Sequence, residues 1–240
     1  MRKDLYGEMF VQEKTYWWHV AKRRLVCEAI GKAKKSQKIL DAGCGTGALI
    51  TDLEKLGYQC WGGDASPEAL KFCQKRGLKN FWLLNFEKKL PTKNNFFDKI
   101  SCLDVLEHVA KDDNLLKEFS RTLETNGRLY ITVPAYRFLW SYWDQMLGHK
   151  RRYSKGELVE LLNNCGFRVC RASYFNSFLL LPVFVIRCFK SGIKDQKSDF
   201  VEVPKWLNFL LIVVSRIESF FVLKSLTPFG LSIFVEAQKK

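Results

Sequence analysis

The feature that most constrains this chain is a run of alternating glycines directly after a short apolar segment. Residues 38–42 (Lys-Ile-Leu-Asp-Ala) have the composition of a buried strand, and Gly43, Gly45 and Gly47 follow at every second position. A helical pattern of apolar residues begins at Ala48. Glycine permits backbone conformations and close approaches that other residues do not. The order strand, glycine loop, helix predicts the first unit of a nucleotide-binding α/β sheet.

Asp41, at the end of this strand, bears on which nucleotide binds. The glycine spacing also fits the looser dinucleotide pattern, but a dinucleotide would bring a diphosphate that the carboxylate repels. S-adenosylmethionine carries an ammonium and a sulfonium and has no phosphate. Residues 41–47, D-A-G-C-G-T-G, resemble motif I of the class I S-adenosylmethionine-dependent methyltransferases. The resemblance implies cofactor contacts from Asp41, Gly43, Cys44, Gly45 and Gly47.

The following segments extend this resemblance. Residues 58–64 predict a second strand that ends at Asp64, near the spacing at which a strand-end acid meets ribose hydroxyls. The resemblance assigns the ribose to Asp64 and the neighbouring Ala65. Residues 80–84 predict a third strand, and the resemblance places Asn85 and Phe86 at the adenine. Many family members have an aspartate here, but the Asn85 amide oxygen can also accept a hydrogen bond.

The remaining pattern completes an α/β fold. Strands are predicted at 98–103, 128–133, 167–174 and 231–237, with a turn at Asn126–Gly127 before the second of these. Helix starts are predicted at Ser66–Pro67 and at a capping box of Ser154 and Glu157. The resemblance places Leu103 and Asp104 beside the cofactor. We expect a Rossmann-like, seven-stranded, mostly parallel sheet with helices on both faces and an antiparallel last strand. Residues 1–35 are expected to form an N-terminal helical cap and residues 36–240 the methyltransferase domain. A helical insertion is expected at 177–226, between strands six and seven.

Residues 136–154 are expected to hold the acceptor, because aromatic side chains alternate there with cations. His149 is our first candidate for the general base and His108 the second. Arg151 and Arg152 could clamp an acidic group of the acceptor, beside Tyr136 and Tyr153. An alternative interpretation pairs the two arginines with acidic residues of the fold, namely Glu157, Glu160 or Asp144.

The net charge of +14 and the apolar insertion both indicate which kinds of partner the protein could bind. Such a charge predicts an anionic partner, but no nucleic-acid-binding motif is found. Arg216 and Glu218 interrupt the longer apolar run, so we expect no membrane span. An apolar stripe could instead lie on an anionic membrane or pack on the sheet or on a second subunit. Its residues are Leu207, Leu210, Leu211, Val214, Ile217 and Phe221, near the cations Arg187, Lys190, Lys194, Lys197, Lys205 and Lys224.

Three further segments narrow the resemblance. Residues 16–19, 149–154 and 228–232 are similar to their counterparts in a bacterial subgroup of type 11 methyltransferases associated with polysaccharide and glycolipid assembly. The resemblance implies O-methylation of a glycan, a lipid-linked sugar or another small-molecule acceptor. We expect a cytoplasmic enzyme, peripheral on the inner face of the membrane.

Two other functions stay open. Asp104-x-x-Glu107-His108 resembles a segment of ubiquinone-biosynthesis O-methyltransferases that can bind a divalent cation, which would make this a metal-assisted quinone or aromatic O-methyltransferase. We nevertheless expect no metal, because the same letters occur in metal-independent relatives. The other alternative is a catalytically silent cofactor-binding protein of a membrane assembly complex.

Overall fold

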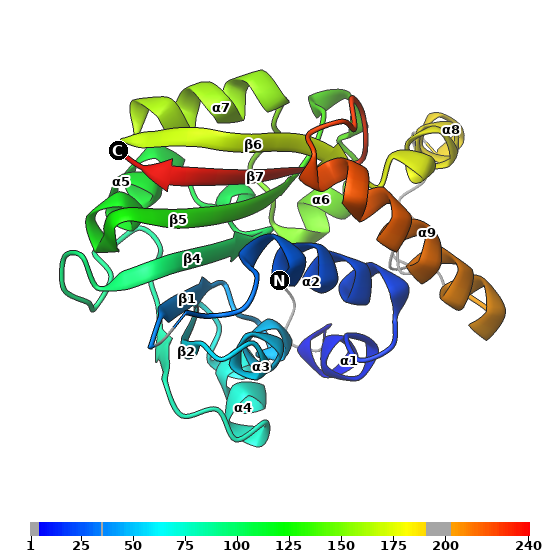
Figure 1. Ribbon diagram of the computed structural model, residues 1–240. Helices are drawn as coiled ribbons and strands as arrows, with labels where there is room; N and C mark the ends of the chain where they lie inside the picture. Colours follow the sequence, from blue (N-terminus) through cyan, green and yellow to red (C-terminus); the bar gives the residue numbers. More distant parts are fainter. Residues whose placement is uncertain (1–4, 35, 191–202) are drawn as a thin grey trace.

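The computed structural model describes residues 5–34, 36–190 and 203–240, and its centre is one seven-stranded sheet (Figure 1). The strand order is β3-β2-β1-β4-β5-β7-β6. All neighbouring strands are parallel except β7, which is antiparallel to β5 and β6. The predicted fold class is therefore confirmed. The strands are β1 (Lys38–Ala42), β2 (Gln59–Asp64), β3 (Phe81–Leu83), β4 (Phe97–Leu103), β5 (Leu123–Pro134), β6 (Phe167–Phe175) and β7 (Ser232–Lys239).

Helices surround this sheet, and two of them begin as the sequence predicts. Ser66 caps α4 with Pro67 at its first position, and Ser154 and Glu157 form a capping box at α7. The helices are α1 (Leu5–Gln12), α2 (Trp17–Ile30), α3 (Ala48–Lys55), α4 (Pro67–Lys75), α5 (Asp112–Thr122), α6 (Tyr142–Leu147), α7 (Lys155–Asn164), α8 (Leu180–Lys190) and α9 (Lys205–Leu223), with 3-10 turns η1 (Leu106–His108), η2 (Arg137–Leu139) and η3 (Ser177–Leu179).

The core lies in two layers, one on each face of the sheet. Side chains alternate along the strands, so Leu40 enters one layer and Ile39 the other. The first layer includes Phe119 of α5 and Leu158 of α7, and the second includes Leu53 of α3. Each fully buried side chain of this size stabilises the fold by about 1.5–3 kcal/mol.

Strand β5 is longer than the sequence predicts. We expected a turn at Asn126–Gly127 and a strand from 128, but β5 already pairs with β4 at Leu123. The ladder then shifts register before Arg128 pairs with Lys99, and Asn126 has a positive φ of 64°. A bulge thus occupies the place of the expected turn.

Two helical segments lie outside this α/β frame. α1 and α2 precede β1, while α8 and α9 follow β6 and project beyond the carboxyl ends of the parallel strands (Figure 1). α8 and α9 account for the expected helical insertion. Lys194 and Lys197, which the sequence analysis counted among its cations, lie outside the described residues.

Candidate active site

The glycine loop leaves β1 at a position where the sheet order reverses. β1 lies between β2 and β4, and ligands of open α/β sheets bind outside the carboxyl ends of strands at such a point. Gly43, Gly45 and Gly47 all have positive φ, of 84°, 53° and 85°. A Cβ on Gly43 would lie 2.0 Å from Val105 Cγ2. Glycine is therefore required there on both steric and conformational grounds.

Asp41 lies within β1, one residue before the strand ends at Ala42. It is only 4% exposed. Its Oδ1 accepts a hydrogen bond of 2.8 Å from the Ser101 hydroxyl. Burial, with smaller contributions from the nearby Asp64 and Glu13 carboxylates, raises the pKa of Asp41 to about 7. A cation bound nearby would favour its ionised form.

Asp64 ends β2 at the same edge and connects two loops. Its carboxylate accepts backbone hydrogen bonds of 2.9 Å from Gly45 and from Ser66. Burial raises the pKa of Asp64, and these N–H donors counteract the rise. Ala65 is exposed at the rim.

The segment predicted to contact the adenine lies after β3. Asn85 is exposed and Phe86 half-buried. The Asn85 side-chain oxygen accepts a 2.9 Å hydrogen bond from the Glu87 amide. This oxygen was expected to serve adenine, so a nucleoside would share or displace that bond.

A contact that the sequence analysis missed covers the glycine loop. Glu13, just after α1, is 6% exposed and binds both the Thr46 hydroxyl and the Arg76 guanidinium. A Cβ on Gly45 would lie 2.9 Å from Met9 Cε of α1, so the helix lies directly over the loop. No spacing rule in the sequence marks an isolated glutamate as a partner of a loop more than 30 residues away.

The mouth through which we expect the acceptor to enter begins where β4 ends. Leu103 is the last residue of β4, and Asp104 follows with a positive φ of 53°. The Asp104 carboxylate binds the Lys22 ammonium of α2 and accepts a 2.8 Å hydrogen bond from the Thr132 hydroxyl. These partners hold the pKa of Asp104 below its usual value although burial opposes them. α2 thus brings Lys22 into the mouth, a residue that the sequence analysis did not select.

His149 is held by a buried ion pair. Its Nδ1 lies 2.8 Å from Asp144 Oδ1, and Arg152 donates to both oxygens of Asp144 at 2.8 and 3.1 Å. Burial alone would raise the pKa of Asp144, but the His149 hydrogen bond and the Arg152 guanidinium keep it well below its usual range. An ionised Asp144 fixes the Nδ1-protonated tautomer of His149 and leaves Nε2 with a free lone pair.

Two further side chains face His149. The ring of His108 lies 4.7 Å from the His149 ring, and its Nδ1 is 3.3 Å from the Gly148 carbonyl oxygen. Burial lowers the pKa of His108 to about 4. Glu107 is fully buried, and neither of its carboxylate oxygens has a hydrogen-bond partner. Burial raises the pKa of Glu107 well above its usual value.

Glu107, His108 and His149 form a possible metal-binding cluster that differs from the one suggested by the sequence. Glu107 Oε1 lies 3.9 Å from His149 Nε2. One ligand atom each from Glu107, His108 and His149 lies within 4.8 Å of the others. The sequence had suggested Asp104 with Glu107 and His108. Lys22 and Thr132 engage Asp104 instead, and His149 completes the cluster.

The residues predicted to bind the acceptor are largely engaged within the fold. Arg152 is 7% exposed and positions Asp144, as the alternative interpretation allowed. Arg151 pairs with Asp112 at 2.6 Å, and the Tyr153 hydroxyl donates to the same carboxylate at 2.8 Å. The structure therefore does not bring Arg151, Arg152 and Tyr153 together as a clamp, because buried carboxylates lie within their reach.

Tyr136 is the remaining predicted acceptor residue. It is half-buried and stacks between Tyr174 and Phe138, with centroid distances of 5.1 and 5.0 Å. Of the predicted acceptor residues it is the one bonded to no carboxylate among the described residues, and it stays a candidate contact.

Comparison with known proteins agrees with this fold. Residues 16–172 match a family model described as a methyltransferase domain. A ubiquinone biosynthesis O-methyltransferase of Xanthomonas oryzae is 28% identical over 101 residues, which is 40% of this chain and 42% of that protein. The homologous enzyme of Pelagibacter ubique is 32% identical over 115 residues, 45% of this chain and 48% of that protein.

Solved structures match over a longer stretch. A SAM-dependent methyltransferase from Archaeoglobus fulgidus superimposes with a TM-score of 0.65 at 19% identity, covering 97% of this chain and 99% of that one. At such identity the likeness shows the fold. This chain spans less than half the length of the curated relatives it matches.

The matched domain covers more than half of the chain. The chain belongs to the methyltransferase domain family, whose class uses S-adenosylmethionine as cofactor. The match is to this domain as a whole and does not reach the polysaccharide-associated type 11 subgroup named from the sequence.

Proposed function

We propose that this methyltransferase transfers a methyl group from S-adenosylmethionine to an oxygen of a small acceptor, such as a glycan or a lipid-linked sugar, at the cytoplasmic face of a membrane. The observation that carries the proposal is the Arg152–Asp144–His149 arrangement beside the carboxyl ends of β4 and β5. It supplies a fixed histidine tautomer with an available Nε2, which is what a general base for a hydroxyl requires.

The chemistry follows from the charges of the reactants. His149 Nε2 accepts the hydroxyl proton while the acceptor oxygen attacks the methyl carbon in line with sulfur. The carbon–sulfur bond breaks, and its electrons neutralise the sulfonium to leave S-adenosylhomocysteine. The methylated product is neutral at that oxygen, and the positive charge remains on His149 beside the ionised Asp144. Alignment of the two reactants by the glycine loop and Asp64 could supply roughly 7–11 kcal/mol of the rate enhancement.

Binding and transfer are tested separately. Calorimetry with S-adenosylhomocysteine should show an affinity that Asp64→Ala lowers at least about tenfold, since a ribose contact of this kind is worth more than 1.4 kcal/mol. Unchanged affinity would remove the ribose assignment. The acceptor is found by incubating methyl-labelled cofactor with a cell extract and identifying the labelled product.

The role of the base is tested on the acceptor so found. His149→Ala should slow single-turnover transfer by about a hundredfold or more, whereas Lys150→Ala, the neighbouring exposed cation, should retain the wild-type rate. Equal rates for His149→Ala and wild type would assign the base elsewhere. Cofactor binding without any transfer would instead support the catalytically silent alternative.

A second candidate function is favoured by the Glu107, His108 and His149 cluster. The unpartnered Glu107 carboxylate and two imidazoles, each with Nδ1 already placed against an oxygen, form a donor set that suits a transition-metal dication more than magnesium or calcium. Such an ion would supply Lewis-acid activation of an aromatic hydroxyl. The ubiquinone biosynthesis O-methyltransferases among the relatives suggest this acceptor class.

Metal binding has a readout that does not depend on activity. Titration of the chelator-treated protein with Mn²⁺ should show one site, and Glu107→Gln should weaken it by about tenfold or more. Asp113→Asn, which alters an exposed carboxylate outside the cluster, serves as the control. No binding by the wild-type protein, or equal binding by Glu107→Gln, would contradict the metal-assisted function and leave His149 as the base.

A further inference from the structure

The exposed apolar side chains of this protein are concentrated on one part of its surface. All but two of the large apolar side chains that are exposed among the described residues lie on α8, α9, the segment after α9 and the loop after β5. The two elsewhere are Val11 and Leu83. We call this set the apolar face: Phe138, Trp140, Leu181, Phe184, Val185, Trp206, Phe209, Leu210, Val213, Ile217, Phe220, Phe221, Leu226 and Phe229.

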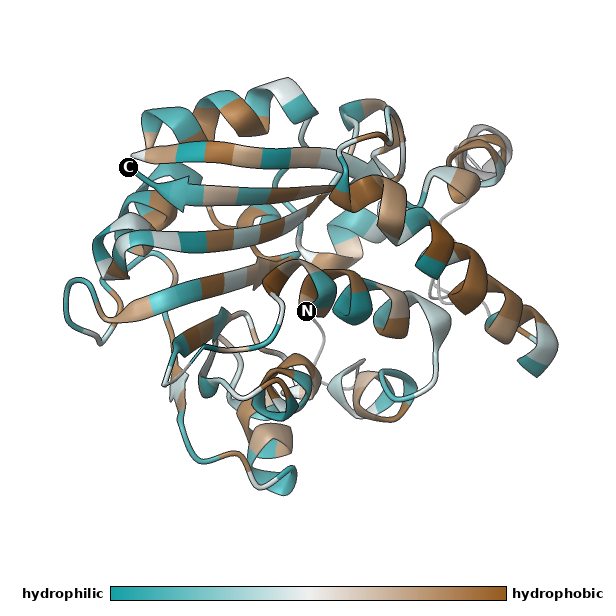
Figure 2. Ribbon diagram, viewed as in Figure 1, coloured by the Kyte–Doolittle hydropathy of each residue, from teal (hydrophilic) through white to brown (hydrophobic). Residues whose placement is uncertain are grey.

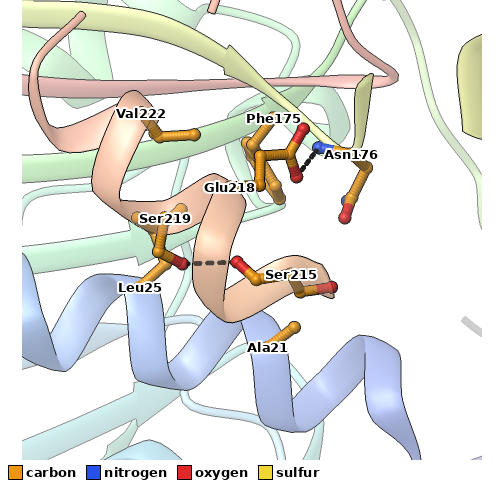
Figure 3. A pocket seen from close by; sticks show the side chains of 8 residues that line it. All are labelled: Ala21, Leu25, Phe175, Asn176, Ser215, Glu218, Ser219 and Val222. Atoms are coloured by element: carbon orange, nitrogen blue, oxygen red, sulfur yellow. Dashed lines mark hydrogen bonds between the residues drawn. The ribbon is translucent and has the colours of Figure 1, made fainter. Parts of the chain in front are cut away.

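On α9 the large apolar side chains point outward and small side chains face the domain, which is the reverse of a core helix. Its buried positions are Ser215, Ser219 and Val222, and these face α2 and the end of β6 (Figure 3). Its outward positions are large: Trp206 is 69% exposed and Phe209 68%. Figure 2 shows hydrophobic colour along much of the part of α9 that projects from the domain. Of the apolar stripe named from the sequence, Leu210, Ile217 and Phe221 are exposed and Leu207, Leu211 and Val214 are half-buried. The side of α9 that is buried against the domain is instead the one with Ser215, Ser219 and Val222.

Polar bonds fix this orientation of α9. Glu218 accepts backbone hydrogen bonds from Asn176 and Ser177, at 2.9 and 2.6 Å, where η3 begins (Figure 3). Asn208 accepts a 2.9 Å bond from the Trp17 amide and donates one of 2.9 Å to the Thr15 carbonyl. Turning the apolar side inward would break all of these bonds, so the exposed side is a stable feature of the fold.

The exposed charges of the described part of α8, of α9 and of the segment after α9 are of one sign, whereas beside Phe138 the exposed Arg137 and Glu157 pair with each other at 2.8 Å. Between 177 and 185 and between 203 and 230 the charged residues are Lys205, Arg216, Glu218 and Lys224. The three cations are exposed, whereas Glu218 is bonded inward to η3. The Lys224 ammonium lies 4.0 Å from the Phe220 ring centroid, so aromatic and cationic groups are adjacent. A surface that is apolar and edged by cations is complementary to an anionic lipid bilayer.

The apolar face continues to the acceptor loop. Tyr174 of β6, Tyr136 and Phe138 stack in sequence, at 5.1 and 5.0 Å between centroids. Phe138 then meets Phe184 of α8 edge-on at 6.0 Å. Tyr136 is the acceptor residue that stayed a candidate above. An unbroken row of aromatic rings thus connects the predicted acceptor site with the exposed surface.

We propose that the apolar face binds the surface of an anionic bilayer, with α9 lying in the interface, and that the acceptor reaches the site from that bilayer as a lipid. By length and composition α9 could cross a membrane, which the sequence analysis did not expect. Its contacts with α2 and β6 and its bond to η3 keep its polar side on the domain, which favours the interfacial position. The acceptor part of this inference rests on the proposed methyltransferase function.

Flotation with vesicles tests the surface. The wild-type chain should float with vesicles of phosphatidylcholine and phosphatidylglycerol, more weakly with phosphatidylcholine alone, and less as salt rises. Phe209→Asp with Ile217→Asp should reduce binding by about a hundredfold or more, since each lost apolar contact is worth about tenfold. Both positions are at least 60% exposed, so folding and S-adenosylhomocysteine binding should be unchanged.

Matched variants act as controls for this experiment. Val11→Asp alters a side chain as exposed as Phe209 but outside the apolar face, and should float like the wild type. The double variant Lys205→Glu, Lys224→Glu should bind the anionic vesicles about 25-fold more weakly, which is about fivefold for each cation. The Lys55→Glu variant, changed on α3, should bind them as the wild type does. Equal flotation of the Phe209/Ile217 variant and the wild type, or no flotation of either, would overturn the proposal. So would a wild-type dimer that this variant dissociates without any vesicle binding, because the face would then join two copies of the chain.

The acceptor is tested with labelled cofactor and two fractions of one cell extract. Label should enter the organic-phase lipids reconstituted in vesicles, and the Phe209/Ile217 variant should transfer at least about tenfold more slowly to them. Label only in water-soluble products, at equal rates for both proteins, would overturn the lipid acceptor while leaving the methyltransferase function intact. If the protein binds the cofactor and floats with vesicles but labels neither fraction, the proposed methyl transfer is contradicted. The proposal that the apolar face binds a bilayer would then still hold.

Discussion

Replacing Glu107 by glutamine should stabilise the protein while weakening its site. The Glu107 carboxyl is fully buried without a hydrogen-bond partner, and its pKa is well above the ordinary value of 4.5 in the folded chain. In the unfolded chain the Glu107 carboxyl loses its proton near pH 4.5. Above that pH, folding therefore requires the carboxyl to bind a proton again. Each pH unit by which the folded pKa lies above 4.5 costs about 1.4 kcal/mol of folding free energy once the pH exceeds the folded pKa. Glutamine has nearly the same shape and no proton to take up.

The sign of the pH dependence follows from this proton. Between the unfolded and the folded pKa of Glu107 the native state binds more protons, so the free energy of unfolding falls as pH rises. Glu107→Gln should remove that part of the slope above pH 4.5 and raise the melting temperature near neutral pH. The rise should be roughly 2–4 °C for each kcal/mol in a chain of this size. Glu54→Gln, an exposed change on α3, should leave stability within about 0.5 kcal/mol of wild type at every pH.

The measurement is urea unfolding of the chelator-treated protein at several pH values, with calorimetry for the melting temperature. An unchanged slope, or a Glu107→Gln protein less stable than wild type at neutral pH, would refute the reasoning. Either result would mean that the carboxylate is ionised and compensated. A stabilised variant that also transfers methyl groups more slowly would show that this carboxyl is kept for the site at the expense of the fold.

Three further predictions concern the described loops and ion pairs. Asp144→Asn should destabilise the fold by about 3–5 kcal/mol in urea unfolding, because it leaves the buried Arg152 without a carboxylate; an unchanged midpoint would contradict the pairing. S-adenosylmethionine affinity, measured by calorimetry, should rise between about pH 6 and 8 as Asp41, with a pKa of about 7, ionises towards the cationic ligand. Asp41→Asn should flatten that rise, and equal pH profiles would exclude this carboxyl. Gly43→Ala should destabilise by about 1–3 kcal/mol because its Cβ meets Val105 at positive φ, whereas Gly156→Ala, with open space and no positive φ, should not; equal melting temperatures would refute the steric argument.

The sequence predicted the seven-stranded, mostly parallel sheet well because the local signals and the tertiary packing agree. The glycine loop, the Ser66–Pro67 helix start and the Ser154–Glu157 capping box are determined within a few residues. The strand containing Asn126 was bounded wrongly, since a bulge and a turn use the same residues. Boundaries of this kind depend on the register of the neighbouring strand, which one sequence does not show.

The site was harder to predict because it depends on pairs distant in sequence. The interpretation of Arg151 and Arg152 as an acceptor clamp considered the cations without their buried partners Asp112 and Asp144. Lys22 lies on α2 and Glu13 just after α1, and no motif specifies where these helices lie relative to the sheet edge. The inward side of α9 was also unexpected, because an apolar stripe at helical spacing is ordinarily the buried one.

The position of Glu13 over the glycine loop has a consequence for the amino-terminal helix. Glu13 is 6% exposed and binds both the Thr46 hydroxyl and the Arg76 guanidinium. Removing one partner of such a buried bond leaves the other unpaired and costs about 1–3 kcal/mol. A chain shortened past Glu13 would therefore lose α1 and would also leave Thr46 and Arg76 without this partner, at the loop that the sequence assigns to the cofactor.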